Sequence, residues 1–307
     1  MAISKRNGMI GILFLVFIFF AIFMVFLAYT FFSLQDQLSG GGFSLNEGNE
    51  DGIALVEIKG MILDSKKAVE ELQKAEESKK IKAILVRIDS PGGAVGPTQE
   101  IYDEIIRIDQ IKPIFASFGS IAASGGYYIG AAARKIYSNS GTLTGSIGVI
   151  MQFMNLSKLY DWAKVSTETI KAGLYKDAGN PARSITEEER KLLNDMIKNV
   201  HQRFKDDILR VRKGRIKGKI DDLAQGQVFS GQGAKDLGLV DEIGSQWAAA
   251  RDLQNLVGLK GKLNLLPMKS KKKFSLFELF DSLDDSVQNF KYGLMLNNVP
   301  LLIYGPR

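Results

Sequence analysis

The sequence predicts an α/β domain with a mostly parallel sheet, attached to an N-terminal transmembrane helix. Two observations carry this prediction. The first is a run without a charged residue from Met9 to Phe32, and the second is a series of β-branched runs that alternate with helix-like stretches from Ile53 onward. A helix as long as the first run crosses a hydrocarbon layer of about 30 Å. Strands that alternate with helices are typical of a domain with a parallel sheet.

The flanks of the apolar run predict its fate and orientation. The run is longer than the apolar core of about 7 to 15 residues in a cleaved signal peptide, and Ala28-Tyr29-Thr30 is a poor cleavage site, so we expect an uncleaved, single-pass anchor. Lys5 and Arg6 precede the run, which leaves the N-terminus in the cytoplasm. The remaining chain is then expected on the periplasmic or outer face of a bacterial inner membrane. The predicted parts are a cytoplasmic N-terminus (1–8), a transmembrane anchor (9–32), a flexible Gly-rich tether (33–52), a folded domain (53–266) and a C-terminal tail (267–307).

Local patterns place the elements of the folded domain. β-branched runs predict strands, and apolar positions at helical spacing predict helices. A capping box formed by Thr186 and Glu189 opens a long amphipathic helix. We expect that helix to bury a stripe made of Leu193, Ile197, Val200, Phe204 and Ile208. Strands are expected at 53–58, 81–88, 114–118, around 136, at 147–151 and at 167–170, and the other helices at 66–80, 98–108 and 125–133.

Composition excludes several kinds of site. The chain has no cysteine, which removes disulfides, thiolate metal sites and cysteine nucleophiles. Its one histidine, His201, lies beside the apolar stripe of the long helix, where we expect a surface or boundary residue, and a single histidine cannot build a multi-histidine metal site. The net charge is +6, and the positive excess lies partly in Arg210–Lys219 and partly in Lys269–Lys273. No nucleic-acid-binding module accompanies these charges, so we interpret them as a solvated face and a basic linker.

Four Gly-rich segments interrupt the α/β pattern where strands are expected to end. They are 89–94, 119–128, 144–149 and 171–177. Ligands gather at the C-terminal ends of strands in open α/β folds, and glycine lets the backbone expose its N–H groups. In the second segment, Ser124 stands at a strand-to-helix junction among small residues, where a hydroxyl is exposed near a helix N-terminus. Close helix–strand packing uses such junctions too, so this segment alone leaves both interpretations open.

Two of these segments together carry a family resemblance. Ser124-Gly125-Gly126, followed by Gly173-Leu174-Tyr175-Lys176-Asp177, resembles the short form of the signal peptide peptidase A family. Members of that family are membrane-bound bacterial serine proteases on the Clp protease and crotonase-like fold, which is built of repeated β-β-α units. The resemblance runs in order from about Ile53 to Val257 and makes 53–266 the protease domain. It implies Ser124 as nucleophile, Lys176 as general base, Ser146 as the hydrogen-bond partner of the lysine amine, and the N–H groups of Gly93 and Gly125 as the oxyanion hole, with no cofactor or metal.

The residue types agree with the implied chemistry. Without a cysteine or a usable histidine, a lysine is the remaining base able to deprotonate a serine, provided that burial lowers its pKa from about 10.4 toward neutrality. The residues alone do not choose Lys176, because a surface role is the default for any lysine and Lys171 is a local competitor. Clp protease itself uses a Ser-His-Asp triad. This chain lacks a histidine shortly after Ser124, which favours the dyad and leaves His201 out of the mechanism.

The resemblance also implies a function and partners. We expect a membrane-anchored serine endopeptidase that degrades remnant signal peptides or other apolar peptides, bound as extended strands. A ring-like homo-oligomer whose sites draw on adjacent subunits is implied as well. Two alternatives stay open, namely a protease of the same fold that acts on membrane proteins and a noncatalytic crotonase-like scaffold. In the tail, apolar and acidic residues alternate from Phe274 to Val287 and predict an amphipathic helix, which could contact either lipid or a neighbouring subunit.

Overall fold

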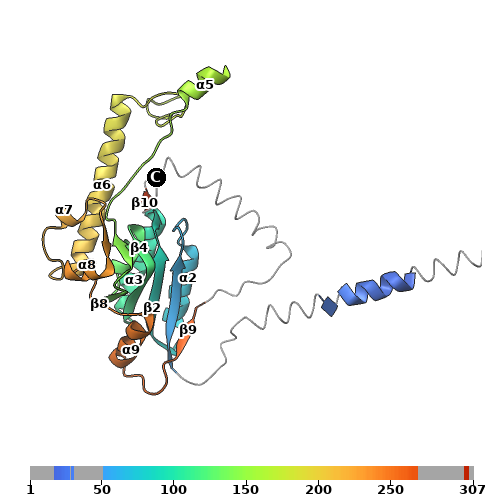
Figure 1. Ribbon diagram of the computed structural model, residues 1–307, viewed down its shortest axis with the longest axis vertical. Helices are drawn as coiled ribbons and strands as arrows, with labels where there is room; N and C mark the ends of the chain where they lie inside the picture. Colours follow the sequence, from blue (N-terminus) through green and yellow to red (C-terminus); the bar gives the residue numbers. More distant parts are fainter. Residues whose placement is uncertain (1–16, 28, 31–50, 269–300, 304–307) are drawn as a thin grey trace, which may run out of the picture. The chain divides into compact units, whose positions relative to one another are not determined.

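The computed structural model describes residues 17–27, 29–30, 51–268 and 301–303 (Figure 1). The chain forms two units, Met1–Asn49 and Glu50–Arg307. In the first unit, residues 17–27 and 29–30 are helical and exposed. Among the residues that are described, no helix is both long enough and apolar enough to cross a membrane. The remainder of the predicted anchor, the tether up to residue 50 and the predicted tail helix at 274–287 lie outside the described residues.

A largely parallel sheet forms the centre of the second unit. Its main path runs β7-β6-β4-β2-β1-β9, while β5 pairs with both β4 and β8. The pairing of β6 with β7 is antiparallel and the other pairings of this sheet are parallel, which confirms the predicted α/β domain. The strands are β1 (Gly52–Lys59), β2 (Ile81–Ser90), β4 (Ile114–Ala123), β5 (Lys135–Ser138), β6 (Leu143–Gly145), β7 (Val228–Ser230), β8 (Glu242–Ile243) and β9 (Leu265–Pro267).

Helices cover both faces of this sheet, as a parallel sheet requires. Successive side chains of a strand point to opposite faces, so β1 contributes Ala54, Val56 and Ile58 to one buried cluster and Ile53 to another. The larger cluster contains residues of α2, α3, α4 and α6, and the smaller one contains residues of α9. The helices of the second unit are α2 (Lys66–Glu77), α3 (Val95–Asp109), α4 (Gly125–Ala131), α5 (Ser157–Ala163), α6 (Glu187–Arg212), α7 (Ile220–Leu223), α8 (Gly231–Asp236) and α9 (Gln246–Leu256).

Two predicted strands are wrong. Residues 147–151 do not form one, because β6 ends at Gly145 and the backbone turns there with φ 79° at Gly145 and 49° at Ser146. Ile147 is buried as a single side chain in the larger cluster, and Ile150 is exposed. Residues 167–170 are also irregular, and Ile170 is 95% exposed. Ile150 makes only an isolated bridge, and the other residues of these two segments are in no strand of the described chain. A strand without continuous pairing to a neighbour is not stable.

The capping box of α6 is confirmed. The Thr186 hydroxyl accepts a hydrogen bond from the Glu189 N–H, and the Glu189 carboxylate accepts one from the Thr186 N–H. The predicted apolar stripe is only half buried: Phe204 and Ile208 are in the core, whereas Leu193, Ile197 and Val200 are partly exposed. The buried apolar side chains of this stripe therefore lie in the C-terminal half of α6.

A buried ion pair fixes the C-terminal end of α6 to the rest of the domain. Arg212 is fully buried and contacts both carboxylate oxygens of Asp241, at 2.7 and 2.9 Å. Asp241 also accepts a hydrogen bond from the Ile136 N–H of β5 at 2.8 Å. Removing one partner of such a pair leaves a buried charge uncompensated, which costs about 3–5 kcal/mol. The end of α6 is thus joined to the central sheet.

Candidate active site

Ser124 lies at a strained turn between β4 and α4. β4 ends at Ala123 and α4 begins at Gly125, so one residue makes the strand-to-helix junction. Ser124 has φ 53° and ψ −114°, a conformation that costs a non-glycine residue on the order of 1–3 kcal/mol. Its N–H donates to the carbonyl of Gly145 at 2.7 Å, and its Oγ lies 3.5 Å from the carbonyl oxygen of Gly148. The turn therefore directs a buried serine hydroxyl toward the segment after β6.

The glycines that follow Ser124 let α4 approach the turn after β2 closely. A Cβ on Gly126 would lie 2.7 Å from the carbonyl oxygen of Ser90, which leaves no room for a side chain. A Cβ on Gly125 would lie 3.2 Å from the backbone nitrogen of Gly93. The Ser-Gly-Gly sequence thus places Gly93 and Gly125 beside the same serine.

Gly93 is the central residue of a short strand, β3 (Gly92–Ala94), which is held along one edge by Ile62. The Ile62 N–H donates to the Gly92 carbonyl at 2.9 Å, and the Ala94 N–H donates to the Ile62 carbonyl at 2.8 Å. Backbone groups alternate between the two edges of a strand. Because Gly92 and Ala94 use their groups on the Ile62 edge, the N–H and carbonyl of Gly93 face the other edge.

A substitution at Gly93 tests this contact. A Cβ there would lie 2.0 Å from the Ile62 carbonyl oxygen, so Gly93→Ala should lower the free energy of unfolding by about 1–3 kcal/mol. Gly96→Ala is the matched control, because Gly96 has nothing within 4 Å of its Cβ position and lies in α3. It should instead raise the free energy of unfolding by about 0.5–1 kcal/mol. Urea unfolding of both variants makes the measurement, and equal effects would contradict the close contact.

Ser146 lies beside Ser124 because β6 pairs with β4. Ala123 is opposite Gly145 in the parallel register, and Ser146 follows directly. Ser146 is 7% exposed and has φ 49°, and its N–H donates to the Gln227 carbonyl at 2.8 Å. Four of the predicted site residues, Gly93, Ser124, Gly125 and Ser146, therefore lie in adjoining segments of the structure.

Lys176, the predicted base, lies in an exposed segment, and no hydrogen bond or ion pair joins it to Ser124 or Ser146 within the described residues. Its local competitor is engaged elsewhere, since Lys171 forms an ion pair with Asp177 and donates to the Leu174 carbonyl at 3.0 Å. The two lysines thus differ: Lys171 is held by a carboxylate, whereas the Lys176 ammonium has no ion-pair partner in the part of the chain that is described.

An ionic network fixes the backbone just after Lys176 to the start of α6. Arg183 contacts Asp177 at 3.0 Å and pairs bidentately with Glu189 in the first turn of the helix. Hydrogen bonds from Arg183 are the main cause that lowers the pKa of Asp177 to about 2 and the pKa of Glu189 to about 2. Both carboxylates therefore stay ionised, and the network intact, until the pH falls toward 2.

Matches to protein-family models establish the family to which the sequence belongs. The model of Peptidase family S49 matches residues 106–260, half of the chain, and the Clp protease model matches residues 56–144. The chain belongs to peptidase family S49. It is thereby a serine peptidase of the signal peptide peptidase A type, with a Clp-protease-like α/β domain, as the resemblance in the sequence implies.

Three relatives illustrate this S49 membership. An inferred protease of Synechocystis is 41% identical over 67% of this chain and 75% of its own length. The chloroplastic serine protease SPPA of Arabidopsis thaliana is 34% identical over 74% of this chain and 34% of its own. An inferred signal peptide peptidase SppA of Enterococcus faecium is 38% identical over 57% of this chain and 51% of its own. The matched part spans only a third to a half of the last two relatives.

Some positioning residues of this S49 peptidase were not predicted. The Asp89 carboxylate accepts hydrogen bonds from the N–H groups of Ser120 and Ile121, at 3.1 and 3.2 Å, and so joins β2 to the strand that ends at Ser124. The Ser90 hydroxyl accepts from the Gly92 N–H at 3.1 Å and holds the turn into β3. Both residues stand in the first Gly-rich segment, whose polar side chains were the available signal.

His201 is half buried in α6, which confirms its interpretation as a boundary residue. Its imidazole lies beside the backbone of Ile147 and Ala224, so it is close in space to the residue that follows Ser146. Burial is the main cause that lowers the pKa of His201, and the charge of Lys205 adds to it. The neutral imidazole is therefore the favoured form. The proximity of His201 to Ile147 could not be predicted from the spacing of these residues along the sequence.

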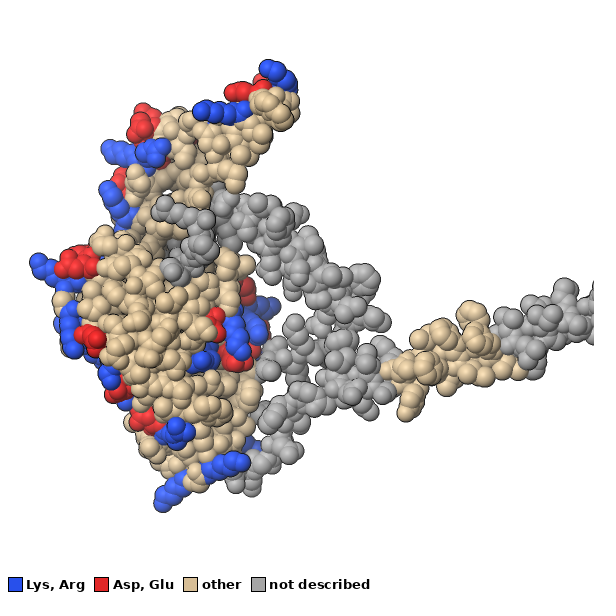
Figure 2. All heavy atoms as spheres, viewed as in Figure 1, with Lys and Arg blue, Asp and Glu red and all other residues tan. Residues whose placement is uncertain are grey.

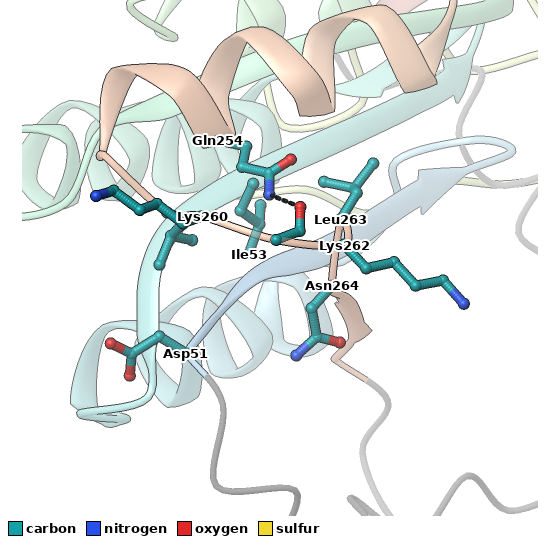
Figure 3. A pocket seen from close by; sticks show the side chains of 9 residues that line it. Asp51, Ile53, Gln254, Lys260, Lys262, Leu263 and Asn264 are labelled. Atoms are coloured by element: carbon teal, nitrogen blue, oxygen red, sulfur yellow. Dashed lines mark hydrogen bonds between the residues drawn. The ribbon is translucent and has the colours of Figure 1, made fainter.

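One pocket formed by the described residues is remote from these segments. It measures about 300 Å³ and lies around Asp51, Gln254 and Lys260–Asn264, near the first residues of β1 (Figure 3). In Figure 3, Gln254 reaches across it and donates to the Gly261 carbonyl at 3.2 Å. The site residues described above lie at or beyond the C-terminal ends of β2, β4 and β6, whereas this pocket adjoins the N-terminal end of β1. It is therefore not part of the candidate active site.

Proposed function

We propose that the chain is a membrane-anchored serine endopeptidase with Ser124 as nucleophile and Lys176 as general base. The observation that carries the proposal is the strained, buried Ser124 between β4 and α4, with Gly93 and Ser146 in the adjoining segments. A serine on a sharp strand-to-helix turn presents its hydroxyl at the end of the sheet, where a substrate can reach it. Backbone strain at a buried position such as this one has a functional explanation more readily than a structural one.

The proposed reaction is acyl transfer followed by hydrolysis. The Ser124 oxygen attacks the scissile carbonyl carbon while the neutral Lys176 amine takes the hydroxyl proton. The oxyanion accepts hydrogen bonds from the N–H groups of Gly93 and Gly125. The C–N bond then breaks and the lysine returns the proton to the leaving amine. Water then attacks the carbonyl carbon of the resulting ester and gives a proton to the lysine. The bond between that carbon and the Ser124 oxygen breaks, the lysine returns the proton to this oxygen, and the acid is released. Ser146 orients the lysine amine throughout.

The exposure of Lys176 supports a site shared between two copies of the chain. A lysine acts as base in its neutral form, which removal from water favours. The segment 150–196 supports a partner surface, because it exposes many large apolar side chains and Trp162 is 80% exposed. In Figure 2 the Lys, Arg, Asp and Glu side chains lie mainly toward the edges of the view, around a broad area that carries none of these four residue types. The exposed apolar residues are Ile150, Met154, Leu159, Trp162, Val165, Ile170, Leu174, Tyr175, Leu192 and Met196.

Burial of these side chains against a second copy would favour a ring-like homo-oligomer. The partly exposed half of the α6 stripe, Leu193, Ile197 and Val200, lies in the same part of the chain. Exposed apolar areas of this extent on a soluble domain are typical of protein contacts. If this surface contacts a different surface of the next copy, the contact is heterologous, and such contacts close into a ring when the rotation between copies divides a full turn.

The uncharged run from Met9 to Phe32 supports an anchor in the bacterial inner membrane, with the catalytic domain on the periplasmic or outer face. A protease in that position meets apolar peptides left in the membrane after secretion. We therefore propose remnant signal peptides as substrates, bound as extended strands. The name of the Enterococcus faecium relative, a signal peptide peptidase, agrees with this proposal.

A product map tests the proposed function. Purified enzyme is incubated with a synthetic signal peptide and, separately, with a purified membrane protein, and the products are identified by mass spectrometry. We expect cleavage within the apolar core of the signal peptide. A serine-directed fluorophosphonate should label Ser124 in the same preparation. Cleavage of the membrane protein alone would refute the substrate assignment, and absence of labelling would favour the noncatalytic scaffold.

A further inference from the structure

Four lysines without a carboxylate partner gather at the edge of the main sheet where its parallel strands begin. Lys79 and Lys80 directly precede β2, and Lys260 and Lys262 stand in the loop that leads into β9. All four residues are exposed, and within the described chain none of their side chains forms an ion pair or a hydrogen bond. In Figure 3, the Lys260 and Lys262 side chains extend away from each other. These ammonium groups are therefore available to a partner.

Hydrogen bonds of β1 bring the two pairs of lysines onto one surface. The Gly52 N–H donates to the Lys80 carbonyl at 2.9 Å, and the Ile53 N–H donates to the Asn264 carbonyl at 3.0 Å. β1 thus lies between the two pairs, and because neighbouring strands are about 4.8 Å apart, the backbones of the pairs are about 10 Å apart. We call this surface, made of residues 51–52, 77–82 and 259–264, the basic edge.

The basic edge carries a surplus of positive charge. Its residues include five lysines and two carboxylates, Asp51 and Glu77. Asp51 is engaged by the fifth lysine, Lys82, at 3.2 Å. A lysine near a helix end often serves the fold, as Lys112 does by donating to carbonyls at the end of α2, at 2.7 and 3.0 Å. The four free lysines make no such contact within the described residues, so the fold does not account for them.

Two large apolar side chains are exposed at the same end of the domain. Ile111, 61% exposed, stands just before β4, and Leu256, 52% exposed, ends α9 before the loop to β9. β4 begins beside β2, because the Ile84 N–H donates to the Pro113 carbonyl at 3.0 Å. A surface that combines exposed apolar side chains with lysines is typical of segments that lie at the headgroups of a bilayer.

The basic edge is also where the chain enters the domain. β1 begins at Gly52, and residues 33–50 form the expected tether to the proposed anchor. A flexible chain of this length has a root-mean-square span of roughly 23 Å. An anchor in the membrane thus keeps the basic edge close to the bilayer, where the lipids act at a high effective concentration.

We propose that the basic edge lies on the membrane surface and binds anionic lipid headgroups through Lys79, Lys80, Lys260 and Lys262. This rests on the proposed function only for the anchor and is independent of the chemistry at Ser124. Each lysine near an anionic surface strengthens binding roughly fivefold, and the attraction extends about 10 Å at about 0.1 M salt.

The proposal sets the height of the candidate active site above the lipid. β2 and β4 each have ten residues and span about 30 Å, and Ser124 follows the far end of β4. With the basic edge on the membrane, the serine stands up to about 30 Å from the headgroups. A substrate peptide therefore leaves the bilayer before it is cut.

Fluorescence quenching in lipid nanodiscs measures the contact on the full chain. The chain has no cysteine, so Asn255→Cys gives one labelling site beside the basic edge, and Ser140→Cys, exposed beyond the end of β5, gives the control. Discs contain a headgroup-spin-labelled lipid as quencher. With phosphatidylglycerol in the disc, we expect quenching at least threefold stronger at position 255 than at 140. The difference should vanish in discs of phosphatidylcholine alone and at about 1 M salt. Equal quenching at both positions in the anionic disc would overturn the proposal.

Substitution of the four lysines tests their role. Replacing Lys79, Lys80, Lys260 and Lys262 by glutamine should abolish the excess quenching at position 255. The matched control makes the same change of charge elsewhere and should keep the quenching within about 20% of the parent, because those lysines lie beyond the reach of the surface potential. Unchanged quenching in the first variant would refute the assignment. Circular dichroism checks that both variants are folded. The control replaces the exposed residues Lys66, Lys67, Lys191 and Lys198.

Two further outcomes separate this proposal from the proposed function. Ser124→Ala should show the same quenching as the parent, so loss of peptidase activity and loss of lipid contact are independent results. If the chain failed to co-elute with nanodiscs, the anchor would be refuted, and sedimentation with phosphatidylglycerol vesicles would then decide the basic edge. There we expect the four-lysine variant to bind at least fiftyfold more weakly than the wild type. Equal binding, or tighter binding of the wild type to a DNA duplex than to these vesicles, would refute the lipid assignment.

Discussion

Replacing Ser124 by alanine is expected to lower kcat toward a peptide substrate by about 10⁴–10⁶-fold, because the attacking oxygen is lost and no other serine occupies the strained turn. Fluorophosphonate labelling should disappear with it. A continuous assay with an internally quenched peptide measures kcat. The unfolding midpoint of Ser124→Ala should stay close to that of the wild type or rise, because the hydrogen bond that the serine Oγ makes to Gly148 is long, at 3.5 Å.

The matched control for this prediction is Ser120→Ala. Ser120 is in the same strand, β4, but is exposed, and its contact with Asp89 is made by the backbone N–H. We expect its kcat and labelling to remain within about twofold of the wild type, as is usual for exposed positions. Activity retained by Ser124→Ala, or lost equally by both variants, would remove Ser124 from the role of nucleophile.

Lys176→Ala should lower kcat by about 10³-fold or more, because the serine hydroxyl is a weak nucleophile without a base. Lys171→Ala is the control. Lys171 is engaged by Asp177, and Asp177 keeps its contact with Arg183 when Lys171 is removed, so the segment around Lys176 should stay in place. The same peptide assay makes the comparison. If Lys171→Ala were the inactive variant, the base would be Lys171.

A mixing experiment distinguishes a site shared by two copies from a site within one chain. Ser124→Ala and Lys176→Ala subunits are unfolded and refolded together in equal amounts. If each site takes its serine from one copy and its lysine from the next, about a quarter of the sites regain both residues. The mixture should then recover about a quarter of wild-type activity. A mixture as inactive as its components would show that serine and lysine come from the same chain.

Much of the central fold could be predicted from the sequence because it is governed by local periodicity. β1, β2, β4 and the helices between them follow from β-branched runs and apolar spacing, with ends that differ by a few residues. The strand expected at 147–151 failed because Ile147 is buried alone beyond a turn, and periodicity does not distinguish one buried side chain from a strand.

The sequence predicts the positions of some candidate site residues better than those of others. Ser124 and Gly93 stand in Gly-rich segments at strand ends, so their proximity follows from the parallel order of β2 and β4. Lys176 has no such signal, since it lies in an exposed segment and no contact of the described residues joins it to the serine. The antiparallel pairing of β10 (Leu301–Ile303) with β3 sets Leu302 opposite Gly93, more than two hundred positions away, and nothing in their local sequence specifies that register.

The anchoring of α6 has a mechanical consequence for catalysis. The helix spans Glu187–Arg212, so it is about 39 Å long, and the Arg212–Asp241 pair holds its C-terminal end. The Arg183 network attaches the segment of Lys176 to the opposite end. A tilt of the helix by about 2° about its C-terminal end would displace its N-terminal end by about 1.4 Å. A displacement of about 1 Å in a catalytic group, such as the proposed base Lys176, can lower the rate a hundredfold. The precision of a shared site would thus be set deep in the core, far from the bond that is cut.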